Sequence, residues 1–216
     1  IARQTFEMCE NLESIELPEM LEVIDNNAFA NCSNLREINF GSNINKIGEY
    51  AFYKCEALKS IGFLAGLGEV GEYAFANCGS LESVSFAAGF VELKAGTFSE
   101  CTALSDVKLS EDLLIIGKKA FYSCISLQNI EIPDTVQSIN ERVFEKCSNL
   151  SKIHLPSLLE SIEEYAFLEC TALVDVELPE HLDFIGLGVF FGCTGLDKMD
   201  IPESVTSIGS HLFYGC

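Results

Sequence analysis

Ten cysteines give this chain its clearest potential for chemistry. They stand at one spacing of 23 residues, at positions 9, 32, 55, 78, 101, 124, 147, 170, 193 and 216. A disulfide framework normally uses irregular spacings in a short chain, and a zinc site uses close pairs such as C-x-x-C, which are absent here. Since cysteine is small and often buried, the spacing favours an inward ladder of free thiols. A few disulfides between adjacent repeats are the alternative.

The cysteines belong to a repeat that includes other apolar residues. Phenylalanine keeps the same period from Phe6 to Phe213, and a leucine follows each cysteine by three residues from Leu12 to Leu196. A period of this length indicates a solenoid, in which each unit buries its apolar side against its neighbours. We expect residues 1–216 to form one solenoid of nine 23-residue repeats and a partial tenth. The chain lacks an initial Met and stops on Cys216, so we expect a fragment of a longer protein.

Each repeat divides into three parts that would position its side chains. The tract Leu127–Ile132 ends in apolar alternation, which predicts a short strand closed by a proline. The tract Val136–Ile139 predicts a second short extended piece. In Glu164–Cys170, apolar residues recur at a spacing that predicts one helical turn, α or 3₁₀, with phenylalanine and cysteine on the core.

Charge excludes some classes of partner. The formal net charge is -20, which disfavours nucleic acid and anionic membrane surfaces. No apolar run is long enough to insert into a membrane. Because the acidic residues are scattered singly, we interpret them as a solvated surface rather than an acidic recognition site.

The repeat resembles a known family. Its L-x-x-I-x-[LIF] signature is similar to the leucine-rich repeat, and the 23-residue form with A-F-x-x-C resembles the BspA-like, Treponema pallidum type class, as in Ala51–Cys55, Ala120–Cys124 and Ala166–Cys170. The resemblance covers essentially the whole chain. It implies a right-handed β/α superhelix with a parallel sheet on the concave face and short second strands and helical turns opposite. It also implies a binding or adhesion module on the surfaces of bacteria and parasitic protists, without catalysis.

The positions flanking the inward isoleucine of the first strand should face solvent, because side chains alternate on a strand. Solenoids commonly bind partners on such a continuous face. The candidate partner-binding residues on this face are Asp106, Lys108, Asn129, Glu131, Lys152, His154, Asp175 and Glu177. Glu131, His154 and Glu177 should stack on consecutive repeats. A catalytic or metal role would need a nucleophile or an open coordination position, so surface ionic packing is favoured, and a plain solvated sheet stays open.

A second candidate surface lies on the corners. Tyr50, Tyr53 and Tyr73 fall on adjacent repeats and could form an exposed aromatic patch. Tyrosine suits interfaces because it buries area and keeps a polar tip. Simple packing of the corner is the alternative.

Taken together, the residues predict a protein-protein interaction module with no enzymatic activity, cofactor or metal. By family resemblance, the partner would be a host extracellular matrix or cell-surface protein, and the module would be at the cell surface or secreted, with a cytoplasmic location left open. A passive spacer and an intracellular scaffold are the alternatives. Both end repeats keep the apolar pattern of interior ones, which predicts end-to-end association of the fragment.

Overall fold

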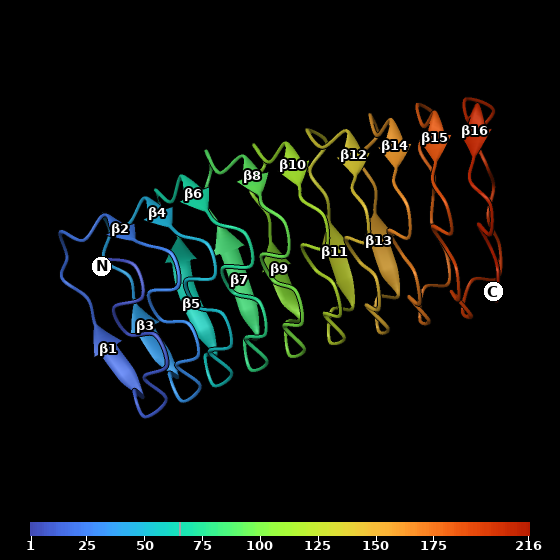
Figure 1. Ribbon diagram of the computed structural model, residues 1–216. Coiled ribbons are helices and arrows are strands. Elements are labelled where there is room, and N and C mark those ends of the chain that lie inside the picture. Colours follow the sequence, from blue (N-terminus) through green and yellow to red (C-terminus); the bar gives the residue numbers. More distant parts are fainter. Residues whose placement is uncertain (65) are drawn as a thin grey trace.

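The computed structural model describes residues 1–64 and 66–216, with backbone alone at residues 62–64. The chain winds into a parallel β-solenoid, in which every repeat stacks on the one before it (Figure 1). The two termini lie at opposite ends of the stack (Figure 1). This arrangement follows from the 23-residue period, because equivalent residues of successive repeats become neighbours.

The first strands of successive repeats form the main sheet. Within it, paired residues are 23 apart, as in Ser14 with Glu37 and Asn129 with Lys152, and the register shifts at one place, between Ser60 and Phe63. The strands of the main sheet are β1 (Ser14–Glu16), β3 (Glu37–Asn39), β5 (Ser60–Leu64), β7 (Ser83–Phe86), β9 (Asp106–Lys108), β11 (Asn129–Glu131) and β13 (Lys152–His154). The predicted first strand is therefore confirmed in these repeats.

The second extended pieces form further short parallel strands. They are β2 (Val23–Ile24), β4 (Lys46–Ile47), β6 (Glu69–Val70), β8 (Glu92–Leu93), β10 (Ile115–Ile116), β12 (Ser138–Ile139), β14 (Ser161–Ile162), β15 (Phe184–Ile185) and β16 (Ser207–Ile208). They pair in three groups, β2-β4-β6, β8-β10 and β12-β14-β15-β16. The second strand predicted from Val136–Ile139 is confirmed by β12.

A column of phenylalanine rings runs through the core. The rings from Phe6 to Phe213 stack nearly parallel, with centroid separations of 5.0 Å at the first pair and 5.9 Å at the last. Interior rings such as Phe121 have no exposed surface. Full burial of each ring stabilises the fold by about 2–3 kcal/mol. The column thus joins every repeat to the next.

The cysteines form the predicted inward ladder. All ten carry free thiols, and those from Cys32 to Cys193 are buried, whereas Cys9 and Cys216 are exposed on the end coils. Each buried Sγ donates a hydrogen bond to the phenylalanine carbonyl of the preceding coil, as from Cys124 to Phe98 at 3.2 Å. That carbonyl also accepts the N–H of Cys101 in its own coil. Cysteine fits this position because it is small, apolar and still a donor.

The corner between the second strand and the first strand of the next repeat is not helical. The predicted helical turn is wrong, because the described part of the chain contains no helix. In the corner Tyr165–Cys170, alternate N–H groups donate to carbonyls three residues earlier, and those between them donate to the next coil. The bonds to the next coil are Tyr165 to Leu187 (2.9 Å), Phe167 to Val189 (3.0 Å) and Glu169 to Phe191 (2.8 Å). A helix would keep these N–H groups for itself, so stacking decides the conformation.

The main sheet is interrupted along the stack. Strands β1, β3, β5, β7 and β9 form one sheet and β11 and β13 another, so β9 and β11 are neighbours without a ladder between them. After β13, the equivalent residues 175–177 are not assigned to a strand. The right-handed winding and the concave placement of the sheet stay predictions of the family resemblance.

Candidate interaction surface

The outward face of the main sheet presents the predicted polar rows. On β11, Asn129 and Glu131 are exposed while Ile130 between them is 2% exposed. On β13, Lys152 and His154 are exposed around the buried Ile153. Asp106, Lys108, Asp175 and Glu177 are exposed as well. The strand alternation therefore places all eight candidate residues in solvent.

Strand pairing brings some of these residues together and leaves others apart. Asn129 lies opposite Lys152, and Glu131 lies opposite His154. Glu177 is not paired with His154 by a strand ladder, since residues 175–177 form no strand. None of the eight makes an ion pair with any residue that the structure describes. Their charges and hydrogen-bonding groups are thus free for a partner.

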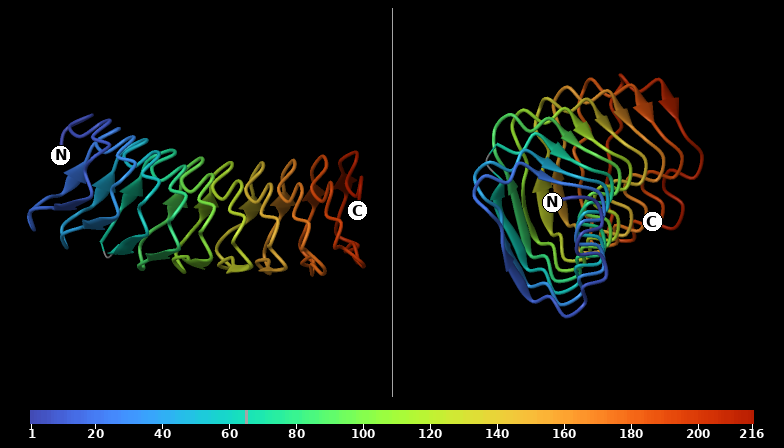
Figure 2. Two further views of the ribbon diagram at one scale, coloured as in Figure 1. Left: turned by 90° about the horizontal axis from the view of Figure 1, so that it is seen from below. Right: turned by 60° about the vertical axis from the view of Figure 1, so that its left-hand side comes forward.

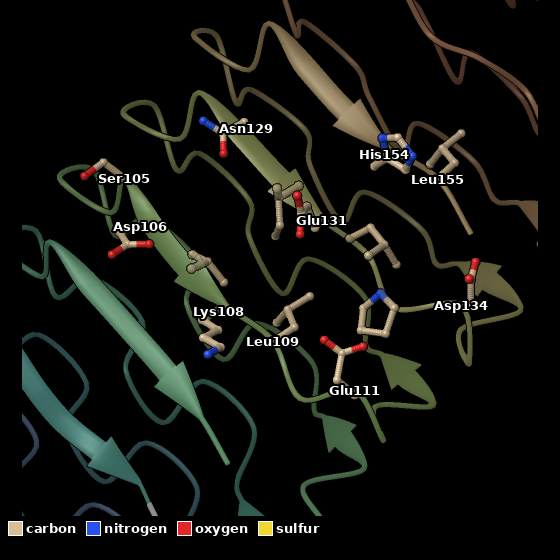
Figure 3. Close-up of a pocket in the computed structure, with 14 residues that line it drawn as sticks. Ser105, Asp106, Lys108, Leu109, Glu111, Asn129, Glu131, Asp134, His154 and Leu155 are labelled. Atoms are coloured by element: carbon tan, nitrogen blue, oxygen red, sulfur yellow. The ribbon is translucent and has the colours of Figure 1, made fainter. Parts of the chain in front are cut away.

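Three grooves lined by described residues lie along this face, and two of them together are lined by all eight candidate residues. The first, of about 640 Å³, lies over β9, β11 and β13. Figure 3 shows its lining side chains, among them Asp106, Lys108, Asn129, Glu131 and His154. The second groove, of about 630 Å³, is lined by the remaining candidates, Lys152, Asp175 and Glu177, and again by His154. All eight candidate residues therefore line one groove or the other, and His154 lines both.

The chemistry of these grooves is that of ionic and hydrogen-bonding contact. Carboxylates, two ammonium groups, one amide and one imidazole face solvent, and apolar floor residues such as Leu109 and Leu155 lie among them. Among the described residues, no group of three histidine, cysteine or acidic side chains is placed to hold a metal ion.

The thiols of the core lie apart from the grooves. Burial raises the pKa of these thiols, to about 12 for Cys101 and Cys147, so they stay protonated at neutral pH.

The three tyrosines lie on a different face. Figure 2 shows the corner column on the opposite side of each coil from the main strands. Tyr50 stacks on Tyr73 with centroids 5.3 Å apart, and it meets Tyr53 edge-on at 5.6 Å. Tyr50 is 36% exposed, and Tyr53 and Tyr73 are half-buried. The structure thus joins the three tyrosines in one cluster, but separates them from the grooves.

Further functional candidates on the corners were missed from the sequence. Tyr122 and Tyr165 are also corner residues, and both carry cationic neighbours; the Arg142 guanidinium lies 4.6 Å from the Tyr165 ring centroid. The chain has six tyrosines, and all of them are on corners: Tyr50, Tyr53, Tyr73, Tyr122, Tyr165 and Tyr214. The missed signal is their position, always two residues before or one residue after the repeat phenylalanine.

Comparison with known proteins identifies the family of this chain. A profile described as BspA type leucine rich repeat region matches residues 1–128 and 91–216. The chain belongs to this family. No curated protein matches this BspA type chain. The family description names a repeat region and no reaction. In the described residues, no helix has the length and apolar character to cross a bilayer.

Solved structures resemble the BspA type chain in fold. The pneumococcal vaccine antigen PcpA is 21% identical, with a TM-score of 0.61 over 94% of this chain and 60% of that chain. A leucine-rich repeat protein from Eubacterium ventriosum is 23% identical, with a TM-score of 0.58 over 90% of this chain and 45% of that chain. The T. pallidum leucine-rich repeat protein is 25% identical, with a TM-score of 0.54 over 92% of this chain and 71% of that chain.

Proposed function

We propose that this chain is a non-catalytic protein-interaction module that binds a partner protein through the main-sheet face. One observation carries the proposal: eight exposed polar residues, which form no ion pair within the described part of the chain, line two grooves at the places where the sheet ladder is interrupted. Mixed charges beside small apolar floors suit a protein surface of matching pattern. The family and the solenoid architecture, which commonly presents an extended binding face, support the same conclusion.

We further propose adhesion as the role, with the module at the cell surface and a host matrix or cell-surface protein as partner. The description of PcpA as a vaccine antigen supports this location by analogy. A passive spacer would present another domain without binding, and an intracellular scaffold would bind a partner inside the cell. Labelling of intact cells with a membrane-impermeant reagent separates surface from interior.

Binding is tested with immobilised chain and a panel of purified matrix and cell-surface proteins. The variant Asn129→Ala, Lys152→Ala, Glu177→Ala should lose capture of the partner. It removes one polar side chain from the first groove and two charged side chains from the second. The control Gln137→Ala, Lys46→Ala, Glu160→Ala also removes one side-chain amide, one lysine and one glutamate, but on the second-strand side, and should keep the capture of the partner. Equal capture by both variants would favour the passive spacer.

A further inference from the structure

A cluster on the corner face gathers positive groups around one tyrosine. We name Lys119, Tyr122, Ser123 and Lys146 the Tyr122 patch. The Lys119 Nζ lies 5.5 Å from the Tyr122 ring centroid, and the Lys146 Nζ lies 5.7 Å from it. The Lys146 Nζ is also 3.4 Å from the Tyr122 Oη. Two ammonium groups from adjacent coils therefore share one aromatic ring.

The acidic residues of this corner are already engaged with other cations. Glu141 pairs with Lys118 at 2.6 Å, and Glu145 pairs with Arg142 at 2.6 Å. Lys119 and Lys146 make no ion pair with the residues that the structure describes. The hydrogen bond to Tyr122 raises the pKa of Lys146, and nearby carboxylates such as Glu169 on the neighbouring coil raise it as well, but they form no ion pair with it in the described part of the chain.

The patch presents hydrogen-bond donors. An ammonium group can only donate, so the Tyr122 Oη must accept from Lys146, which leaves the tyrosine O–H free to donate outward. The neighbouring Ser123 is half-buried and adds a hydroxyl group. Two ammonium groups and a free phenol O–H complement an oxyanion, since charge-assisted bonds to carboxylate or phosphate are the strong ones.

Neighbouring coils limit the size of the anion. Glu100 occupies the Ser123 position one coil earlier, and Glu169 occupies the Lys146 position one coil later, and both are exposed. A polyanion such as a sulfated glycan chain would bring further negative charges against these carboxylates. One isolated anionic group avoids that repulsion.

We propose that the Tyr122 patch binds a single carboxylate or phosphate side chain on a partner protein. The site lies on the corner face, so it is independent of the main-sheet grooves, and it adds a second contact to the interaction module. A partner that bridges both faces of the rod would gain from the two contacts together, whereas a partner at the corner alone would bind weakly.

The test is NMR titration of the whole chain with two peptides, one carrying a single glutamate and the other a single phosphoserine in an otherwise neutral sequence. Either peptide should shift the amide signals of the Tyr122 patch, and the double variant Lys119→Gln, Lys146→Gln should weaken binding about tenfold or more. The control Arg36→Gln, Lys59→Gln makes the same charge change at exposed positions outside both the patch and the grooves, and it should bind both peptides normally.

A third variant addresses the phenol group. Tyr122→Phe keeps the ring beside both ammonium groups but loses the O–H, so affinity should fall about threefold to tenfold. No amide shifts at millimolar peptide, or equal weakening by the two double variants, would overturn the proposal. Tighter binding of a heparin-type polyanion than of either peptide, with the same dependence on Lys119 and Lys146, would assign the patch to glycans instead. Partner capture by the Asn129, Lys152, Glu177 triple variant tests the grooves, which share no residue with the patch, so failure of the proposed function is distinguished from failure of this proposal.

Discussion

At the scale of single residues, each corner holds two backbone positions in the left-handed conformation. They lie two residues before and two residues after the repeat phenylalanine, and most are not glycine: Asn27 and Asn31, Tyr50 and Lys54, Tyr73 and Asn77, Lys119 and Ser123, Arg142 and Lys146, Tyr165 and Glu169. For a residue with a Cβ, this conformation is less stable than the right-handed one by about 1–2 kcal/mol, whereas glycine adopts it with almost no loss of stability. Inter-coil hydrogen bonds offset that strain.

Glu169→Gly should therefore stabilise the chain. Glu169 has φ of 59° and is exposed, so glycine relieves strain there without removing a buried contact. We expect a gain of about 1 kcal/mol, seen as a higher midpoint in thermal unfolding followed by circular dichroism. The control Glu164→Gly in the same corner has no positive φ to relieve and should lower the midpoint. A rise in both variants would point to loss of acidic repulsion instead.

At the scale of elements, the strands were predictable and the corner was not. Alternating apolar residues in Leu127–Ile132 report directly which side chains face inward, and β11 follows them. The spacing of Ala166, Phe167 and Cys170 is equally compatible with a helical turn and with consecutive β-turns, because both place these three side chains on the core. Only the hydrogen bonds to Leu187 and Val189 of the next coil distinguish the two, and they depend on stacking.

The corner also sets a steric requirement that couples adjacent coils. A Cβ on Gly96 would fall 2.2 Å from the Tyr73 Cε1, and φ there is +62°. Gly96→Ala should thus force the Tyr73 ring away and cost about 2–4 kcal/mol in unfolding free energy. At Gly89, φ is +89° and no atom of the described residues lies within 4 Å of an added Cβ, so Gly89→Ala should cost about 1–2 kcal/mol.

Urea unfolding of the two alanine variants measures the difference. Equal costs would mean that Tyr73 moves freely, and the tyrosine cluster would then be a mobile surface rather than corner packing.

Like the corner conformation, the candidate grooves depend on how neighbouring coils stack and not on the sequence of one repeat. All eight polar residues were identified from strand alternation, but the interruption of the ladder between β9 and β11, over which the first groove lies, was not predicted from the repeat.

At the scale of the whole molecule, stability is shared between neighbouring coils. Each coil contacts only the coils beside it, so a central defect weakens two interfaces and an end defect weakens one. Phe121→Ala removes a ring with no exposed surface and should cost about 3–5 kcal/mol. Phe213→Ala removes a ring that is 39% exposed and should cost less than half as much. Thermal unfolding monitored by circular dichroism compares them, and equal costs would contradict nearest-neighbour coupling.

The thiol ladder makes the whole rod sensitive to alkaline pH. Burial raises the pKa of Cys101 and Cys147 to about 12, and it also raises the pKa of Cys78, Cys124 and Cys170 well above the usual range of a thiol. In the unfolded chain, a cysteine thiol has a pKa of about 8.5. Between these values the unfolded chain binds fewer protons than the folded chain, so stability is complete below about pH 8.5 and falls as the pH rises.

Each buried thiol should contribute about 1.4 kcal/mol of lost stability per pH unit within that window, and the contributions of the ladder add. Urea unfolding from pH 7 to pH 11 should therefore show an abrupt decline above about pH 8.5. Removing one thiol, as in Cys124→Val, should make the decline shallower by about 1.4 kcal/mol per pH unit, whatever its effect at neutral pH. Lysine and tyrosine ionisation is common to both proteins and cancels in this comparison. Identical slopes would show that the thiols are not buried together in the folded rod.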